Sequence, residues 1–155
     1  MSEPIVRFIG IGKTYDGVTR VVEHLDLDIE RGEFLTLLGP SGSGKTTTLM
    51  MLAGFETPTE GEILLEGKPL SKLPPYRRSI GMVFQNYALF PHMTVAQNIG
   101  FPLSVRGIGA AEIAQRVERA LDMVQLPGLG ARKPAQLSGG QRQRVAIGRA
   151  IVRRP

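Results

Sequence analysis

The chain has 155 residues, 42% of them hydrophobic and 21% charged, with a formal net charge of +5. This composition is typical of a globular protein and argues against a disordered chain, while the absence of cysteine excludes a disulfide scaffold, a thiolate metal site and a cysteine nucleophile. No apolar run reaches the roughly 20 residues that span a bilayer, and the N-terminus lacks the pattern of a secretory signal, so we expect a cytosolic domain.

The charge is distributed unevenly along the chain. Residues 1–80 carry 9 basic and 11 acidic side chains, whereas residues 81–155 carry 10 and 3. A basic half predicts either an anionic partner or carboxylates supplied by a segment that this chain lacks. Both interpretations stay open at this point.

Strands and one helix are predicted in the first half. Residues 20–29 end in alternation between apolar and acidic side chains, which predicts a half-buried strand. Residues 33–38 (EFLTLL) form a short apolar run, typical of a strand buried on both faces. A buried helix closed by Gly54 follows. Residues 61–70 are typical of a hairpin that turns at Gly67.

Helices dominate the second half, after a last short strand expected at 80–84. Thr94 and Gln97 form a capping-box pattern that starts a helix. A second helix has one apolar face and is stopped by Pro127-Gly128; its face consists of Ile113, Val117, Leu121 and Val124. Ser138 is expected to cap a final helix that runs to Pro155. An α/β protein is predicted, with a strand-rich half before a helical half.

A glycine-rich loop between the strand at 33–38 and the helix before Gly54 carries the clearest chemistry. Residues 39–46 read GPSGSGKT, a full match to the G-x-x-x-x-G-K-[ST] phosphate-binding pattern. Glycines let successive N–H groups turn toward phosphate oxygens, and the following helix adds its positive dipole end. Lys45 is expected to reach the β- and γ-phosphates, and the Thr46 hydroxyl to coordinate Mg²⁺.

A second glycine-led helix start occurs at 137–141 (LSGGQ). Ser138 is a good cap, and Gly139 and Gly140 leave the first backbone N–H groups unshielded. Because each glycine costs about 1 kcal/mol against alanine in a helix, a purely structural helix has little reason to keep both. The pattern indicates a second anion site, although an ordinary capped helix would also explain it.

Three stretches together resemble one family, the ATP-binding subunits of ATP-binding cassette (ABC) transporters. They are the loop 39–46, MVFQNYALFPHMTV at 82–95, and LSGGQRQRVAIGRA at 137–150. The whole chain follows the order of that family. It resembles most the ATPases of bacterial binding-protein-dependent importers of the spermidine/putrescine type, with ferric-iron, maltose and sulfate importers close behind.

The resemblance implies a fold and an organisation. The fold would be an α/β P-loop NTPase (RecA-like) core with an N-terminal antiparallel β part and an ABC helical subdomain. Residues 1–155 would form an ABC nucleotide-binding domain, with a β-rich core carrying the Walker A loop at about 1–85 and a helical subdomain ending in the signature helix at about 86–155.

The resemblance also implies roles for single residues, with ATP and Mg²⁺ as cofactors. Lys45 and Gln85 would act in catalysis, and Thr46 and Gln85 would contact the metal; Gln85 would also contact the attacking water and link the site to the membrane partner. The nucleotide would be bound by Tyr15 and Val21 beside adenine, by Gly39, Pro40, Ser41, Gly42, Ser43, Gly44, Lys45, Thr46 and Thr47, and, from a second copy, by Ser138, Gly139, Gly140 and Gln141.

Partners follow from the same resemblance. A second ATPase subunit would form a head-to-tail dimer with ATP at the joint. Residues 86–105 would receive a helix of a membrane permease subunit, with a solute-binding protein acting indirectly from outside. The apolar residues Tyr87, Leu89, Phe90 and Phe101 suit such docking, but core packing explains them equally well. We expect a peripheral protein at the cytoplasmic face of the inner membrane, and no nucleic acid.

Three groups of that family have no counterpart here. The resemblance implies a Walker B Asp, a catalytic Glu and a switch His after the signature helix, and the sequence reaches Pro155 without them, so we expect an incomplete domain that lacks the C-terminal part of the core. Glu66 follows an apolar run but precedes Gly67, so a hairpin turn is the better interpretation. His24 and His92 are expected to be plain surface residues.

The predicted function is therefore an ATP-binding subunit, hydrolytic when complete, that drives solute import, with a polyamine as the candidate solute. One alternative is a non-hydrolysing nucleotide-binding fragment. Another is a cassette ATPase that acts on nucleic acid, suggested by five arginines of the last helix, Arg142, Arg144, Arg149, Arg153 and Arg154.

Overall fold

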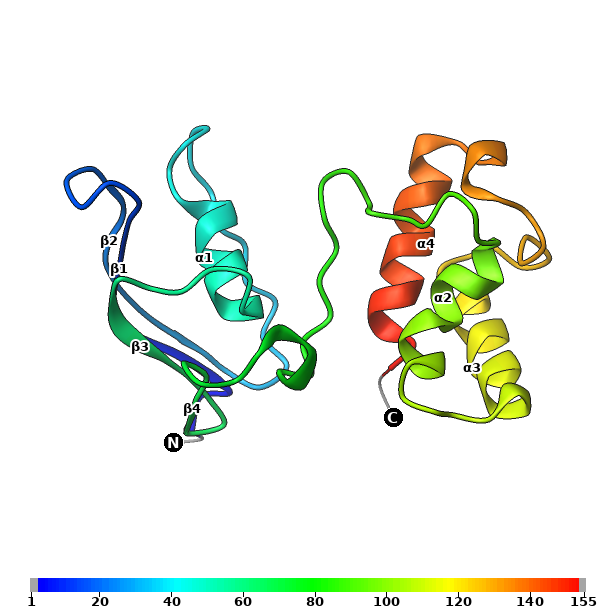
Figure 1. The fold of residues 1–155 in the computed structure, drawn as a ribbon, viewed down its shortest axis with the longest axis horizontal. Coiled ribbons are helices and arrows are strands. Elements are labelled where there is room, and N and C mark those ends of the chain that lie inside the picture. Colours follow the sequence, from blue (N-terminus) through cyan, green and yellow to red (C-terminus); the bar gives the residue numbers. More distant parts are fainter. Residues whose placement is uncertain (1–2, 154–155) are drawn as a thin grey trace. The chain divides into compact units, whose positions relative to one another are not determined.

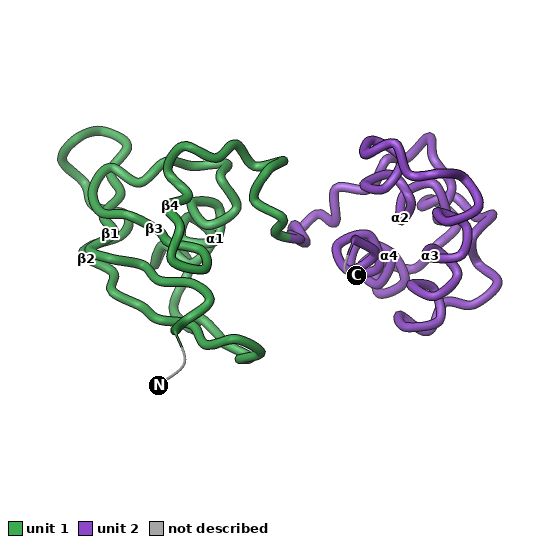
Figure 2. Tube along the Cα trace, turned by 90° about the horizontal axis from the view of Figure 1, so that it is seen from below, with its two compact units in different colours: residues 1–80 green, residues 81–155 purple. Residues whose placement is uncertain are grey.

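The computed structural model describes residues 3–153 (Figure 1). The chain divides between Ile80 and Gly81 into two compact units (Figure 2), referred to as unit 1 and unit 2. Each unit is described on its own. Within residues 3–153, every helix falls short of the length and apolar character needed to cross a bilayer.

Unit 1 contains a four-stranded antiparallel sheet in the order β2-β1-β3-β4. The strands are β1 Val6–Thr14, β2 Arg20–Ile29, β3 Glu60–Leu65 and β4 Lys68–Pro69. Glu66 and Gly67 join β3 to β4 with φ angles of 49° and 73°, which is the left-handed backbone of a tight hairpin turn. The hairpin predicted at Gly67 is thus confirmed, as is the strand at 20–29.

The sheet packs its apolar face against helix α1, Lys45–Ala53. Phe8 of β1 pairs with Leu27 on one side and with Ile63 on the other, so the three strands align their buried residues. Met51 of α1 is fully buried in the same cluster. At about 25 cal/mol per Å² of apolar surface, this burial is the main term that holds α1 on the sheet.

The C-terminal end of α1 is fixed by a buried arginine. Arg78 donates from Nη1 to the carbonyl oxygens of Met51 (2.8 Å) and Leu52 (2.9 Å), and from Nε to Leu73 O (2.8 Å). Burial lowers the pKa of its guanidinium. A cation at this position satisfies the last carbonyl groups of α1 and complements the negative end of the helix dipole.

The strands predicted at 33–38 and 80–84 are wrong for the described structure, where neither segment pairs with a neighbouring strand. Phe34 is 94% and Leu38 90% exposed, although their composition suggested burial on both faces. An apolar run becomes a strand only where adjacent strands accept its hydrogen bonds, and the run alone does not reveal whether such strands are present.

Unit 2 is a bundle of three helices: α2 Val95–Ser104, α3 Ala110–Met123 and α4 Gly139–Ile151. The Thr94–Gln97 capping box is confirmed, with Gln97 N donating to Thr94 Oγ1 (3.2 Å) and Thr94 N donating to Gln97 Oε1 (2.8 Å). The predicted apolar face of α3 is also confirmed, although α3 ends at Met123, four residues before Pro127.

Asn98, fully buried in α2, fixes the segment that leads into this bundle. Its Oδ1 accepts from Phe90 N (2.8 Å), and its Nδ2 donates to carbonyl oxygens of Phe90, Met93 and Thr94. A buried amide with all these partners holds the backbone at 90–94 in one conformation. Two short 3₁₀ helices, η1 Pro75–Arg77 and η2 Pro134–Gln136, complete the elements.

Candidate functional site

The glycine-rich loop of residues 39–46 turns directly into α1. Ser43 N donates to Pro40 O (3.2 Å), which closes a tight turn at 40–43. Gly42 and Gly44 have φ angles of 81° and 84°. Only residues without a Cβ adopt this backbone readily, so the two glycines are required by the conformation of the loop.

Two glycines of the loop also lie where no side chain fits. A Cβ on Gly39 would be 2.6 Å from Ser43 Oγ. A Cβ on Gly44 would be 2.6 Å from Val21 O and 2.9 Å from Val22 Cγ2, both on β2. The start of α1 is therefore packed tightly against β2, which fixes the direction in which the first turn of the helix points.

The first turn of α1 presents unpaired backbone donors. Gly44 is the N-cap and offers no side-chain acceptor, and the first helical hydrogen bond runs from Thr48 N to Gly44 O (2.8 Å). Within residues 3–153, the N–H groups of Lys45, Thr46 and Thr47 have no hydrogen-bond acceptor. Unpaired donors at the positive end of a helix dipole are the elements of an anion site.

Lys45 fills the loop with its own ammonium group. Its Nζ donates to Gly39 O (2.7 Å), Pro40 O (2.7 Å) and Ser43 Oγ (2.9 Å). An ammonium group has three donors, so all three are engaged inside the loop. The charge is thus held within the same turn as the free N–H groups, beside the exposed Thr46.

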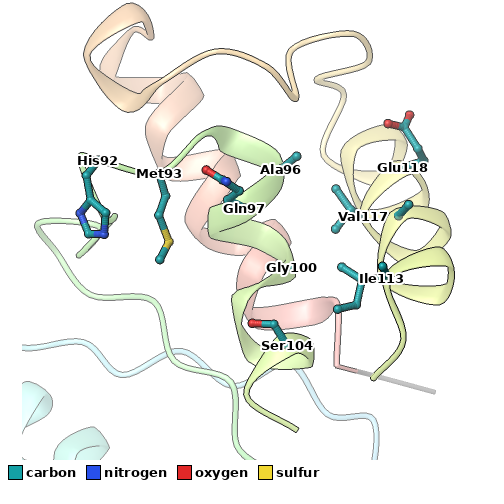
Figure 3. A pocket seen from close by; sticks show the side chains of 11 residues that line it. His92, Met93, Ala96, Gln97, Gly100, Ser104, Ile113, Val117 and Glu118 are labelled. Carbon is teal, nitrogen blue, oxygen red and sulfur yellow. The ribbon is translucent and has the colours of Figure 1, made fainter. Parts of the chain in front are cut away.

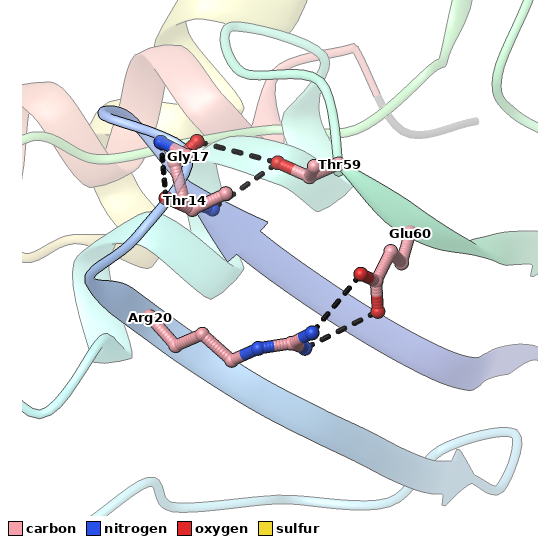
Figure 4. Close-up of polar contacts among 5 residues, drawn as sticks. All are labelled: Thr14, Gly17, Arg20, Thr59 and Glu60. Atoms are coloured by element: carbon pink, nitrogen blue, oxygen red, sulfur yellow. Dashed lines mark hydrogen bonds and ion pairs between the residues drawn. The ribbon is translucent and has the colours of Figure 1, made fainter.

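The turn that carries Tyr15 is built by a polar network between β1, β2 and β3 (Figure 4). Gly17 N donates to Thr14 Oγ1 (2.9 Å), and Thr14 N donates to Thr59 Oγ1 (3.1 Å). Arg20 and Glu60 add a bidentate ion pair with distances of 3.1 and 3.2 Å. These bonds brace both sides of the turn.

Asp16 organises the inside of this turn. Its carboxylate accepts from Val18 N (2.9 Å), Thr19 N (2.6 Å) and Thr14 Oγ1 (3.1 Å). The backbone N–H groups of Val18 and Thr19, which bond the charged form, hold the pKa of this carboxyl well below its usual range. The turn is therefore stabilised by the ionised side chain next to Tyr15.

The ring of Tyr15 is 61% exposed and is held from one side by a cation. Lys13 Nζ lies 4.7 Å from the ring centroid and is itself fixed by Thr57 O (2.8 Å) and Glu56 (3.0 Å). An exposed aromatic ring on a braced turn offers a flat surface for stacking. Val21, the second residue expected near adenine, belongs to the same unit and contacts the start of α1 through its carbonyl oxygen.

The second glycine-led helix start has the expected cap. Gln141 N donates to Ser138 Oγ (3.2 Å), and Ser138 N donates to Gln141 Oε1 (2.9 Å). A Cβ on Gly139 or Gly140 would meet nothing within 4 Å. Internal packing in unit 2 therefore does not require either glycine, and both lie exposed at the N-terminal end of α4.

Gln85 is exposed in a turn in which Tyr87 N donates to Phe84 O (2.9 Å). It belongs to unit 2 together with Ser138–Gln141, whereas the loop 39–46 and the Tyr15 turn belong to unit 1. The predicted site residues are thus divided between the two units.

Other candidates have ordinary roles in the described structure. Glu66 lies in the hairpin turn, and the hydrogen bond from Arg31 (2.5 Å) lowers the pKa of its carboxyl. His24 pairs with Asp26 on the surface (3.2 Å), and His92 packs edge-on against Phe90. Within residues 3–153, three or more His, Cys, Asp or Glu side chains nowhere gather as a metal site.

The apolar residues at 87–101 are largely explained by packing. Leu89 packs against the core of unit 2, and the rings of Phe90 and Phe101 lie 4.8 Å apart. Beside them, a groove of about 610 Å³ runs between α2 and α3 (Figure 3). Ala96 and Gly100 line it from α2, and Ile113 and Val117 from α3.

The arginines of α4 do not form one free basic face. Arg144 donates to Val124 O (3.4 Å) and Gln125 O (3.3 Å), and Arg149 donates to two carbonyl groups of the segment 87–88. Arg142 is exposed, and Arg154 lies outside the described residues. Internal hydrogen bonds thus account for two of the five arginines that suggested nucleic acid.

The sequence did not indicate the roles of Arg78, which was not singled out, and of Arg149, which was singled out only as part of a basic cluster. Both bind backbone carbonyl groups far away in the chain, and a single arginine between ordinary neighbours carries no local signal of such a role. Neither the two prolines at 74–75, which precede Arg78, nor the residues at 87–88 indicate in the sequence which side chain binds which carbonyl group.

Comparisons with known proteins agree with this geometry. A family profile described as "ABC transporter" matches residues 22–155. The sn-glycerol-3-phosphate import ATP-binding protein UgpC of Burkholderia thailandensis is 57% identical over 146 residues, which cover 94% of this chain and 41% of the relative. The spermidine/putrescine import ATP-binding protein PotA of Vibrio cholerae is 50% identical over 155 residues, all of this chain and 41% of the relative.

The chain therefore spans about two fifths of the length of these curated relatives. A solved structure, the dimeric post-hydrolysis state of the ATP-binding cassette MJ0796 bound to ADP and Pi, superposes with a TM-score of 0.88 at 36% identity. The match covers 97% of this chain and 70% of that chain. It confirms the predicted α/β fold class, with the antiparallel sheet and the helices forming part of a P-loop NTPase core.

Proposed function

Because the chain belongs to the ABC transporter family, we propose that it is the ATP-binding part of an import ATPase, and that residues 39–47 bind the triphosphate of ATP. The observation that carries the proposal is the first turn of α1. In that turn, three unpaired N–H groups and the Lys45 ammonium group lie in one loop. The conformation of this loop requires its glycines.

Binding of a triphosphate would exchange partners within this loop. The N–H groups of Lys45, Thr46 and Thr47 donate to phosphate oxygens, and Lys45 replaces its carbonyl acceptors with the β- and γ-phosphates. Mg²⁺ would neutralise charge on the phosphates, and the Thr46 hydroxyl would be its ligand in unit 1. From the family resemblance we also propose Gln85 as a metal contact. Charged acceptors form stronger bonds with Lys45 than neutral carbonyls do, which drives the exchange.

The Tyr15 turn would hold the base. Tyr15 is exposed and braced, and Val21 lies between this turn and the start of α1, so a nucleotide whose phosphates bind the loop has an aromatic surface within the same unit. Stacking on an aromatic ring is worth about 1–3 kcal/mol per base and does not depend strongly on which base is present. We therefore expect Tyr15 to contribute affinity more than selectivity.

The N-terminus of α4 would bind the nucleotide of a second copy. Ser138 accepts from Gln141 N but keeps its hydroxyl hydrogen as a donor, and the space beside the Cα atoms of Gly139 and Gly140 is open. MJ0796, at 36% identity, is described as a dimer. A γ-phosphate shared between Lys45 of one copy and Ser138 of the next would join the two head to tail.

Coupling to import would use the helices of unit 2. The relatives are named as import ATP-binding proteins, which implies permease subunits in the inner membrane and, indirectly, a solute-binding protein. We propose that segment 86–105 is the receiving surface, together with the face of α3 that lines the same groove, and that this groove takes one face of a membrane-subunit helix. Ala114→Arg in the groove should abolish uptake and spare ATP hydrolysis, whereas Ala111→Arg, outside it, should change neither.

The solute is either a polyamine or sn-glycerol 3-phosphate, since relatives named for each are similarly close. The two carry opposite charge. Uptake of labelled spermidine and of labelled sn-glycerol 3-phosphate, measured in cells with and without the gene, separates the two assignments.

The nucleotide proposal is tested by equilibrium titration with Mg-ATP. Lys45→Ala should weaken binding at least about tenfold, because it removes the only ammonium group in the loop. Lys72→Ala, an exposed lysine of unit 1, serves as the matched control and should bind like the wild type. Equal affinities for all three proteins would contradict the proposal.

Hydrolysis is proposed for the whole protein and nucleotide binding for the residues described here. The alternative, a chain that binds nucleotide without turning it over, gives the same titration but no release of phosphate. Measuring phosphate release beside binding separates the two.

A further inference from the structure

Arg149, in the last turn of α4, holds the backbone of the segment that follows Gln85. Its Nη1 donates to Ala88 O (2.8 Å) and its Nη2 to Tyr87 O (3.0 Å). The guanidinium carbon lies 5.7 Å from the centroid of the Phe90 ring. One planar group thus contacts three residues of this segment, two through hydrogen bonds to backbone carbonyl groups and one through the face of its ring.

The backbone at these positions is unusual. Tyr87 and Ala88 have φ angles of 64° and 46°, in the left-handed region that side chains with a Cβ disfavour. Two such residues in sequence persist only where the surroundings fix them. Arg149 supplies that fixation, because both carbonyl oxygens that the turn directs at α4 are bound by the same guanidinium group.

The other end of the segment is held separately. Asn98 binds both the N–H and the carbonyl of Phe90. Gln85 lies between these anchored residues and the start of unit 2, in the turn closed by Tyr87 N and Phe84 O. Its position relative to α4 therefore depends on the contact that Arg149 makes two residues further on.

Arg149 is partly buried, and burial lowers the pKa of its guanidinium. Desolvation of a cation is unfavourable unless its hydrogen bonds compensate. The position is thus not explained as a solvated charge on a helix surface. The groups that face it are the two carbonyl oxygens and the Phe90 ring.

We propose that Arg149 is a positioning residue that joins the Gln85 turn to the helix headed by Ser138, so that the metal-contacting glutamine and the second phosphate site are held in one rigid arrangement. This rests on the proposed function for the roles of Gln85 and Ser138. The contact itself is independent of that function.

The test uses two variants of the full-length protein. Arg149→Met keeps most of the bulk of the side chain and removes both hydrogen bonds. Arg149→Lys keeps the charge but not the planar guanidinium group that donates both hydrogen bonds. Arg119→Met, an exposed arginine of α3, is the matched control. In Arg149→Met we expect kcat for ATP to fall at least about tenfold with KM within about threefold, because Lys45 and its loop, which would bind the triphosphate, are unchanged. Arg149→Lys should recover part of kcat, and Arg119→Met should match the wild type.

Hydrogen exchange of the Tyr87 amide gives the second measurement. It should be about tenfold or more faster in Arg149→Met than in the wild type, without a comparable change at Val117 in the core of unit 2. Wild-type kcat and wild-type exchange in a folded Arg149→Met protein would overturn the proposal. If Arg149→Met does not fold, unchanged kcat and exchange in Arg149→Lys would overturn it equally.

The two proposals fail in different ways. Failure of the wild type to bind or hydrolyse Mg-ATP would contradict the proposed function, and the exchange measurement would still show whether Arg149 holds the turn. A wild type that hydrolyses ATP, together with an Arg149→Met protein of normal kcat, would contradict the positioning role alone.

Discussion

The carbonyl oxygen of Val21 lies against Gly44, so closely that a Cβ on the glycine would be 2.6 Å from it. This contact joins β2 to the first turn of α1 and sets the direction of the unpaired N–H groups at Lys45–Thr47. The geometry of the proposed phosphate site therefore depends on a strand that carries no phosphate-binding residue.

Gly44→Ala should damage this contact. The added Cβ meets Val21 O and Val22 Cγ2, and φ is +84°, so we expect the free energy of unfolding to fall by about 2–3 kcal/mol and Mg-ATP binding to be lost. Gly42→Ala is the matched control, because it has a similar φ of +81° and open space around it. Its expected loss is about 1 kcal/mol. Urea denaturation of both variants measures the difference, and equal losses would show that the contact with β2 is unimportant.

Arg78→Met should destabilise the helix that carries the loop. The change leaves the carbonyl groups of Met51, Leu52 and Leu73 without their donor, which we expect to cost about 3 kcal/mol. Arg77→Met removes an exposed neighbour that only flanks the Tyr76 ring and should cost less than about 0.5 kcal/mol. The urea midpoints of the two variants test this, and a similar midpoint for both would contradict the capping role of Arg78.

Stability should depend on pH through Asp16. The folded pKa of its carboxyl lies below the ordinary value of 3.8, so its ionised form stabilises the Tyr15 turn at neutral pH. That contribution is complete above the ordinary pKa and is lost as the pH falls below it. Asp16→Asn should therefore be less stable than the wild type at pH 7, and the difference should shrink between pH 4 and pH 2. A difference that is constant over this range would rule out the ionised carboxylate as the cause.

Gly139→Asp should separate folding from assembly. Because a Cβ at this position meets nothing within 4 Å, the thermal unfolding midpoint should stay within a few degrees of the wild type. The new carboxylate would repel a γ-phosphate from a second copy, so ATP-dependent dimerisation should be lost while one copy still binds Mg-ATP. Light scattering of the full-length protein with and without Mg-ATP measures this. Gly139→Ala is the control, and a dimer in both variants would contradict the shared site.

Much of the fold followed from local patterns. The capping box at Thr94, the cap at Ser138 and the hairpin at Gly67 were predicted correctly, because each depends on residues only a few positions apart. The apolar face of α3 was predicted for the same reason. Each of these signals depends only on residues that are close together in the sequence.

The predictions that were wrong or missing depend on residues that lie far apart in the sequence. Residues 33–38 have the composition of a buried strand, but pairing depends on distant segments that the run itself does not reveal. The roles of Arg78 and Arg149 depend on carbonyl groups 26–27 and 61–62 residues away. The glycine pattern at 39–46 predicted the loop, whereas the contact of Gly44 with β2 required the structure.

The most direct test of the phosphate site is a ¹H–¹⁵N spectrum recorded while Mg-ATP is added. We predict that the amide resonances of Lys45, Thr46 and Thr47 shift and saturate together, because these three N–H groups gain phosphate acceptors, and that Lys45→Ala abolishes the effect at the same ATP concentration. Saturable shifts elsewhere, with these three amides unmoved, would contradict the account.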